Sequence, residues 1–176
     1  MTLTLSSAIT EYFEAKRAQR LSGCTLSDYG NTFRKFSAFA GDCQVDRIEP
    51  HTIARFLAST ENVSRKTVLN YHTALSSLWT YLVLFGYASE NIVRRVPPLR
   101  LDKKEVVPFS RDEVVVLLRV VKVNPAEARN RAIILLLLDT GLRASEICTL
   151  RVKDIDLVDR KVRTMGKGRK EQSVPF

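Results

Sequence analysis

Apolar residues recur at helical spacing in the first part of the chain. Ile9, Tyr12 and Phe13 share one face of a segment that runs from Ser6 or Ser7 to Leu21. A second segment begins near Thr25, where "TLSD" resembles a helix-capping box, and its apolar residues fall at 26, 29, 33, 36 and 40. Steps of three and four residues place side chains on one face of a helix. The pattern therefore predicts two amphipathic helices.

Two more helices follow by the same criterion. A short one begins after Pro50 and turns Ile53, Phe56 and Leu57 to one side. The longest pattern runs from Ser64 to a stop at Gly86, and its inward residues are Val68, Tyr71, Leu75, Leu78, Leu82 and Phe85. Four helices with short connections predict a small bundle over residues 1–93.

The pattern stops at residues 94–108, "RRVPPLRLDKKEVVP". This segment has three prolines, five basic and two acidic residues, and no helical period. Proline-rich, charged segments without periodicity are typical of linkers. We therefore expect an interdomain linker here.

Residues 109–176 predict a second domain in which helices lead into strands. "SRDE" at 110–113 is a capping box that opens a helix with Val114, Leu117, Leu118 and Val121 inside. Asn124 and Pro125 open the next helix, which carries the apolar run 133–138 and ends at Gly141. After a short helix, "RKVRTM" and "QSVPF" predict two strands joined across "GKGRKE". The predicted fold is mainly α, with a small antiparallel β-hairpin.

The positive net charge of the chain indicates which class of partner it can bind. The formal net charge is +9 and the pI about 9.7, with +4 on residues 1–100 and +5 on the rest. Such a surplus favours a polyanion, although charge alone does not separate nucleic acid from a membrane surface. Three cysteines without CxxC spacing predict neither disulfides nor a metal site. The absence of a signal peptide pattern or a membrane-spanning apolar run predicts a cytoplasmic protein.

The stretch "DTGLRASEICTLRVKDID" contains the first candidates for chemistry. Arg143 follows the glycine stop at a helix N-terminus, where free N–H groups favour anions, and its guanidinium can hold two phosphate oxygens. Glu146 lies three residues on, where it can orient the guanidinium. An ordinary ion pair that stabilises the first helical turn is the alternative interpretation.

Lys167 lies between two glycines at the predicted hairpin tip. It could neutralise a phosphate or donate a proton to a departing alkoxide. A solvated turn lysine is the alternative.

Taken together, these motifs strongly resemble the tyrosine recombinases, or phage integrase family, including the Xer-type resolvases. The resemblance rests on "TGLR", "SEICTLRVKDID", "GKGRKE" and "SVPF", and more weakly on "TLSDYGNTFRKFSAFA" and "SRKTVLNYHTALSSLWTYLVLFGY". It implies an N-terminal core-binding (SAM-like) four-helix domain over 1–93 and the first part of an α+β catalytic domain over 109–176. The two domains would close around duplex DNA.

The resemblance also implies a reaction that needs no metal and no cofactor. A tyrosine attacks the scissile phosphate of DNA and forms a 3′-phosphotyrosyl link. Arg143 matches the arginine that grips this phosphate, Glu146 matches the supporting acid, and Lys167 matches the lysine that helps the 5′-hydroxyl leave. Full-length members act as tetramers on DNA.

The family's second arginine, its histidine partner and its nucleophile come after the hairpin. Here all five tyrosines and both histidines precede Arg143. Tyr71 lies on an apolar helix face, which favours a core position. We therefore expect this chain alone to bind DNA without cleaving it, and to be monomeric.

Several basic residues are candidates for contacts with DNA phosphates. They are Arg34, Lys35, Arg65, Lys66, Arg94, Arg95, Lys103, Lys104, Arg169 and Lys170. Two alternatives to a recombinase remain open: a shortened, non-catalytic relative that occupies recombination sites, and a helical module that binds protein. No membrane partner is expected.

Overall fold

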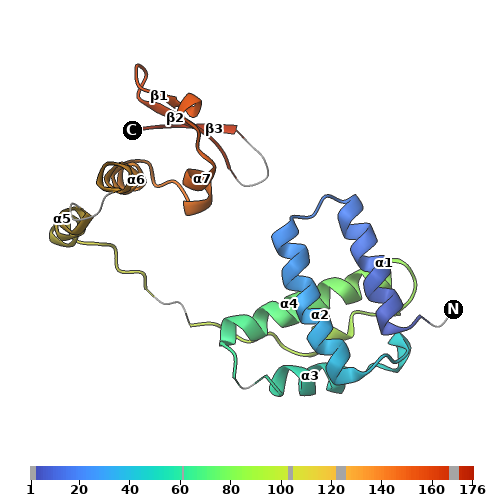
Figure 1. The fold of residues 1–176 in the computed structure, drawn as a ribbon. Helices are drawn as coiled ribbons and strands as arrows, with labels where there is room; N and C mark the ends of the chain where they lie inside the picture. Colours follow the sequence, from blue (N-terminus) through green and yellow to red (C-terminus); the bar gives the residue numbers. More distant parts are fainter. Residues whose placement is uncertain (1–2, 61, 103–104, 122–125, 167–170) are drawn as a thin grey trace. The chain divides into compact units, whose positions relative to one another are not determined.

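The computed structural model of the chain is mainly helical, with one small antiparallel sheet (Figure 1). It describes residues 3–60, 62–102, 105–121, 126–166 and 171–176. The elements form two compact units, Met1–Lys104 (unit 1) and Glu105–Phe176 (unit 2). The predicted fold class is confirmed, and the boundary between the units falls within the segment predicted as a linker.

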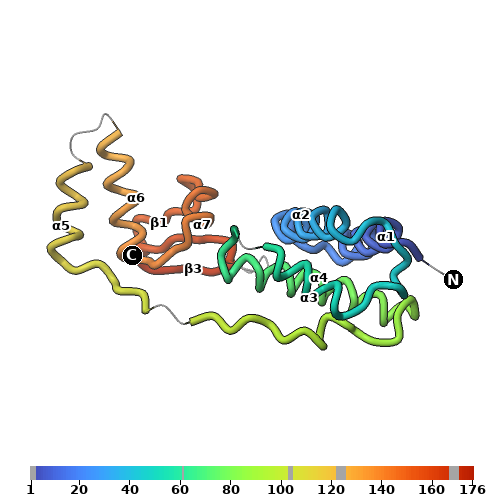
Figure 2. Tube along the Cα trace, turned by 90° about the horizontal axis from the view of Figure 1, so that it is seen from below, coloured from blue at the N-terminus to red at the C-terminus, as the bar shows by residue number. Residues whose placement is uncertain are grey.

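Unit 1 contains the four predicted helices. They are α1 (Leu5–Ala18), α2 (Gly23–Ala40), α3 (Pro50–Ala58) and α4 (Arg65–Leu84). Two 3-10 turns, η1 (Val45–Arg47) and η2 (Ile92–Arg95), follow α2 and α4. In Figure 2, α1 and α2 form one layer of the unit, and α3 and α4 form the other.

Side-chain caps fix where these helices begin. Ser64 accepts a hydrogen bond from the N–H of Thr67, which starts α4 where the sequence predicts. The predicted start of the second helix near Thr25 is wrong, because Ser22 caps this helix and accepts from the N–H of Thr25. Because the Ser22 side chain already binds the N–H of Thr25, the helix begins at Gly23, before the "TLSD" motif.

Aromatic side chains fill the core of unit 1. Tyr12, Phe33, Phe36 and Trp79 are at most 1% exposed, and Leu75, Leu78 and Leu82 of α4 are fully buried beside them. The hydroxyl groups of Tyr12 and Ser77 are 2.8 Å apart and hydrogen-bonded. Burial raises the pKa of Tyr12 to about 12. One face of α4 thus forms the wall against which the other helices pack.

The end of α4 differs from its predicted pattern. The helical spacing predicts Phe85 on the buried face, but the helix ends at Leu84 and the Phe85 side chain is 55% exposed. Gly86 follows with a positive φ of 75°, and Tyr87 donates its N–H back to the carbonyl of Leu82. Because this turn reverses the chain, the helical period no longer decides where Phe85 points.

Unit 2 begins with two helices that lie side by side in both views (Figures 1 and 2). They are α5 (Arg111–Val120) and α6 (Glu127–Thr140). The predicted capping box of α5 is confirmed, since Ser110 and Glu113 exchange hydrogen bonds. Asn124 and Pro125, predicted to open α6, lie outside the described residues.

The predicted inward positions of α5 are wrong, and the apolar run of α6 is not buried either. Neither helix has a buried residue, and Leu117 of α5 is 39% exposed. In α6 the apolar run leaves Leu135 43% and Leu138 49% exposed. Because α6 is apolar on several sides, burying it requires packing partners on several sides. The described part of unit 2 covers only some of these sides.

The sheet of unit 2 has the order β1-β2-β3. The two predicted strands are β2 (Lys161–Met165) and β3 (Glu171–Pro175), which pair antiparallel with Val162 opposite Val174. A two-residue strand that the sequence did not predict, β1 (Ile155–Asp156), pairs with the other edge of β2. Val162 and Thr164 point inward from β2 and are buried.

Two leucines of α4 provide a matched test of the unit 1 core. Leu78 is fully buried, whereas Leu84, on the same helix, is 77% exposed. We predict that Leu78→Ala lowers the free energy of unfolding of unit 1 by roughly 2–5 kcal/mol. Leu84→Ala should change it by about 0.5 kcal/mol or less. Urea unfolding followed by Trp79 fluorescence checks this; equal effects would contradict the described core.

Candidate functional site

The turn between α6 and α7 (Ala144–Thr149) determines where Arg143 lies. Gly141 ends α6 in the left-handed region with a φ of 63°, a conformation that glycine adopts without steric cost. The hydroxyl of Thr140 donates to the carbonyl of Leu136 and accepts the N–H of Leu142. Leu142 is 5% exposed and anchors the turn. Arg143 follows as the residue that caps α7.

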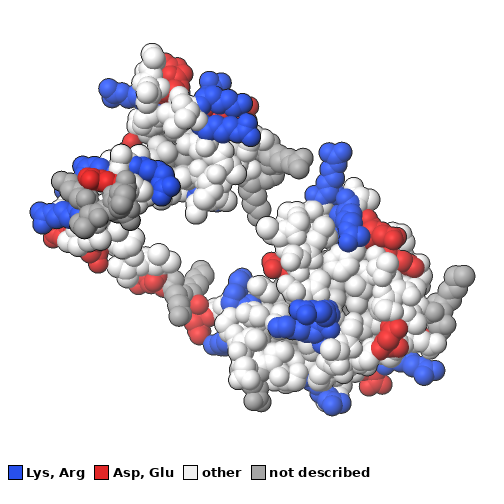
Figure 3. Space-filling view, viewed as in Figure 1, with Lys and Arg blue, Asp and Glu red and all other residues white. Residues whose placement is uncertain are grey.

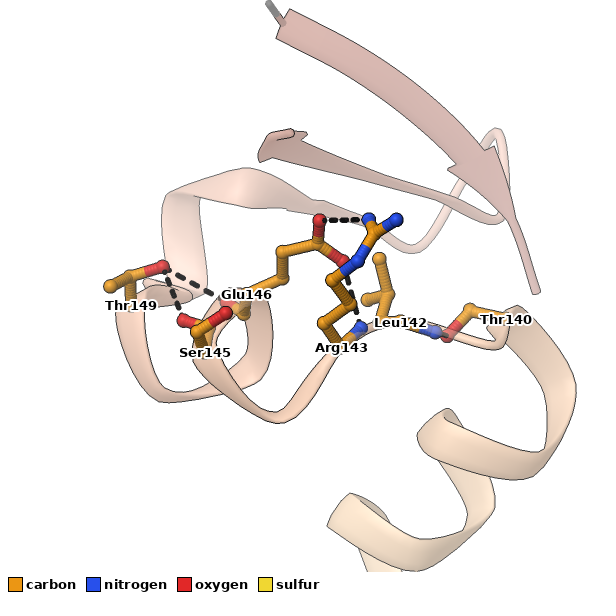
Figure 4. A network of polar contacts seen from close by, with 6 residues as sticks. All are labelled: Thr140, Leu142, Arg143, Ser145, Glu146 and Thr149. Atoms are coloured by element: carbon orange, nitrogen blue, oxygen red, sulfur yellow. Dashed lines mark hydrogen bonds and ion pairs between the residues drawn. The ribbon is translucent and has the colours of Figure 1, made fainter. Parts of the chain in front are cut away.

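Arg143 and Glu146 are joined by two hydrogen bonds (Figure 4). The backbone N–H of Arg143 donates to Oε2 of Glu146 at 2.8 Å, and Nη1 of its guanidinium donates to Oε1 at 2.9 Å. The Arg143 side chain is 68% exposed, whereas that of Glu146 is 6% exposed. The buried carboxylate thus holds one edge of an exposed guanidinium.

The surroundings of Glu146 favour its charged form. The N–H of Arg143, followed by its guanidinium, holds the pKa of Glu146 below its usual value, although burial acts in the opposite direction. A carboxylate accepts hydrogen bonds with both oxygens, so it can bind the backbone and the guanidinium at once. The arrangement can therefore present a fixed cation to an anion in solution.

The other predicted residues of this site belong to the β2–β3 connection. Lys167, Arg169 and Lys170 lie outside the described residues, so the structure does not test their positions. The strands on either side are described: β2 ends at Met165, and β3 begins at Glu171.

Some of the predicted phosphate contacts in unit 1 already have acidic partners. Nη1 of Arg65 lies 3.0 Å from Oδ2 of Asp102, and Nη2 of Arg95 lies 2.5 Å from Oε1 of Glu90. Arg34 donates to the side-chain oxygen of Asn31 at 3.3 Å. Lys103 and Lys104 lie outside the described residues.

The remaining cations differ in their contacts. Nζ of Lys35 donates to the hydroxyl of Tyr71 at 2.5 Å and lies 5.0 Å from the centre of its ring. Lys66, in the first turn of α4, and Arg94, in η2, are exposed. Figure 3 shows basic side chains spread over both units, with acidic side chains among them. Within each unit, acidic side chains therefore interrupt the basic ones on the face drawn.

Sequence reasoning missed a polar cleft beside Glu146. A cavity of about 650 Å³ is lined by Arg151, Lys153, Arg163, Thr149 and neighbouring residues of α7, β2 and β3. The alternation of exposed Lys161, Arg163 and Met165 along β2 could have indicated Arg163, because period-two spacing separates the two faces of a strand. Arg151 and Lys153 had no such periodic signal.

Three of the five tyrosines are buried. Tyr12 is fully buried, Tyr71 is 6% exposed and Tyr81 is 8% exposed. Tyr71 therefore lies in the core, as its spacing predicts.

The described residues offer no metal site and no membrane helix. They contain no cluster of three or more His, Cys, Asp or Glu side chains arranged to share an ion. None of the helices in the described ranges has both the length and the apolarity that crossing a bilayer requires.

Several solved structures have the same fold. A lambda integrase dimer bound to a COC′ core site superposes with a TM-score of 0.81 at 18% identity, over 99% of this chain and 49% of that chain. The Tn1549 transposon integrase in complex with circular intermediate DNA gives 0.75 at 18% identity, over 99% of this chain and 61% of that one.

Curated relatives are more similar in sequence. A tyrosine recombinase of Thermosipho africanus is 34% identical over 90% of this chain and 58% of its own length. Tyrosine recombinase XerD of Oceanobacillus iheyensis is 30% identical over 98% of this chain and 60% of its own length. The chain thus spans less than two thirds of the length of these relatives.

Two family models match separate parts of the chain. The model for the phage integrase N-terminal SAM-like domain matches residues 9–86, which comprise most of the bundle. The model for the phage integrase family matches residues 108–176, which include the Arg143–Glu146 pair and the sheet. With both models matched in this order, the chain belongs to the phage integrase family of tyrosine recombinases.

Proposed function

We propose that this chain binds duplex DNA and supplies the core-binding domain and the first part of the catalytic domain of a site-specific recombinase. Residues 1–93 would form the core-binding domain, 94–108 the linker and 109–176 the catalytic part. Relatives named tyrosine recombinases and a lambda integrase tetramer bound to a Holliday junction support this assignment. We propose a cytoplasmic location, as the sequence predicts.

One observation supports the phosphate-binding role most directly. The guanidinium of Arg143 is held on one side by the buried Glu146 and is 68% exposed. Arginine has five N–H donors, so Nη1 can serve Glu146 while other donors bind two oxygens of a phosphate. Arg143 would thus stabilise the charge that develops on a phosphate under attack.

The other roles in the reaction follow from the same proposal. Lys167 would donate a proton to the 5′-hydroxyl as it leaves, because an alkoxide is a poor leaving group. Glu146 would act as a positioning residue for Arg143. The burial of Tyr12, Tyr71 and Tyr81 argues against these three as the nucleophile.

DNA binding and its dependence on salt test the Arg143 role. We predict that log Kd for duplex DNA changes steeply with log salt concentration, by roughly 0.9 per neutralised phosphate. Arg143→Ala should weaken binding to all sequences and reduce this slope by about 1. Fluorescence anisotropy with a labelled mixed-sequence duplex measures both quantities.

Arg119→Ala is the matched control for this experiment. Arg119 is exposed in the last turn of α5, and its replacement removes the same charge from the same unit. Equal losses for the two variants would contradict a specific role for Arg143. A wild-type slope near zero would contradict DNA binding itself.

The lowered pKa of Glu146 predicts a pH-dependent stability of unit 2. Because its pKa in the folded chain lies below the usual 4.5, Glu146 stabilises the folded state above pH 4.5. This contribution is lost as the pH falls through the lower, folded-state pKa. Glu146→Gln should therefore destabilise unit 2 near neutral pH, and the difference from wild type should shrink in acid.

Urea unfolding followed by far-ultraviolet circular dichroism, at neutral pH and near pH 3, measures this difference. Glu105→Gln is the control, because Glu105 is exposed and has no hydrogen bond to the described residues. A difference between Glu146→Gln and wild type that stays constant with pH would contradict the ionised pair.

A further inference from the structure

The first half of the linker does not leave unit 1 freely. Residues 96–102 run back along α4, from His72 towards the N-terminal end of the helix at Arg65. This course can be followed in Figure 2, where the segment after η2 passes beside α3 and α4. Sequence reasoning took residue 94 as the start of the linker, but the chain stays in contact with α4 as far as Asp102.

The contact nearest to η2 is buried. Nε2 of His72 lies 2.8 Å from the carbonyl oxygen of Val96, and since a carbonyl can only accept, the ring nitrogen donates. His72 is 9% exposed, so water cannot easily replace this bond. Val96 also donates its N–H to the carbonyl of Val93. This end of the segment is therefore firmly attached.

The contact at the far end is exposed. Arg65 donates from Nη1 to Oδ2 of Asp102 at 3.0 Å and from Nη2 to the carbonyl of Arg100 at 3.1 Å. The Arg65 side chain is 62% exposed and that of Asp102 is 90% exposed. An exposed ion pair contributes little to stability, so another anion can displace Asp102.

We propose that Arg65 alternates between two anionic partners, Asp102 and a DNA phosphate, so that DNA binding releases residues 100–102 from α4. The inference rests on the proposed DNA binding. The two terminal nitrogens that now contact Asp102 and the Arg100 carbonyl can instead donate to two oxygens of one phosphate. A phosphate on this guanidinium would repel the Asp102 carboxylate beside it, and Asp102 is 90% exposed and therefore able to leave. A phosphate bound at Arg65 would thus free the linker beyond His72.

The exchange couples DNA binding to the length of linker that is held on α4. Without DNA, side-chain contacts hold the linker to α4 as far as Asp102. With Arg65 on a phosphate, the last of these contacts would be that of His72 with Val96, about six residues earlier in the chain. Asp102 thereby competes with DNA and lowers the affinity.

Limited proteolysis tests the Arg65 contact without DNA. Trypsin cleaves after Arg100, whose carbonyl accepts a hydrogen bond from Arg65. We predict that Arg65→Gln accelerates this cleavage severalfold, measured by mass spectrometry. Lys66→Gln is the matched control, because it removes the same charge and one trypsin site from the adjacent exposed residue. Equal rates of cleavage after Arg100 in the two variants would overturn the inference that Arg65 holds the linker on α4.

Affinity for a short mixed-sequence duplex tests the competition. Asp102→Asn should tighten binding about two- to fivefold, the range expected for an exposed ion pair. Glu105→Gln removes the same charge from the same linker and should have a smaller effect. In an Arg65→Gln background, Asp102→Asn should have no more effect than Glu105→Gln.

The outcomes separate this inference from the proposed function. If Asp102→Asn tightens binding equally with and without Arg65, general charge repulsion explains the effect and the exchange is overturned. If no variant binds duplex, the proposed function fails and the competition fails with it. The proteolysis result still decides independently whether Arg65 holds the linker.

Discussion

The burial of one face of α4 is the constraint on which the rest of unit 1 depends. Leu75, Leu78, Trp79 and Leu82 are withdrawn from water on this face, and the aromatic residues of α1 and α2 pack around them. A helix fixed in this way becomes a rigid support for whatever lies on its other sides. His72 and Arg65 belong to this helix and hold the linker at Val96 and Asp102. The course of the linker therefore depends on the same hydrophobic burial.

Unit 2 is organised around a polar contact. Its described part buries few side chains, and one of these is the carboxylate of Glu146. A buried charge needs hydrogen-bond donors, and both oxygens of Glu146 obtain them from Arg143. The interaction that stabilises the start of α7 is therefore the one that fixes the exposed guanidinium. The ordinary ion pair and the phosphate site, which are alternatives on sequence grounds, are compatible in this geometry.

The features predicted correctly from sequence are those that depend on residues close together in the chain. The spacing of Leu75, Leu78 and Leu82 predicted the buried face of α4, and the glycine stop predicted where α6 ends. The predicted inward face of α5 is not buried, because apolar spacing leads to burial only where a packing partner is present, and no local pattern shows whether one is. The pairing of Arg65 with Asp102 could not be predicted from local sequence either, because Asp102 lies 37 residues away and comes near only through the course of the linker.

The structure changes what the net charge of +9 means for binding. A count of charges treats every cation as equally available to a phosphate. Arg65 and Arg95 are each bound to a carboxylate, so a phosphate must first displace Asp102 or Glu90 to reach them. Lys66 and Arg94 are exposed, and in the described part of the chain neither is bound to a carboxylate. Counterion release should therefore be greatest at such unpaired cations, while the paired arginines link binding to rearrangement of the chain.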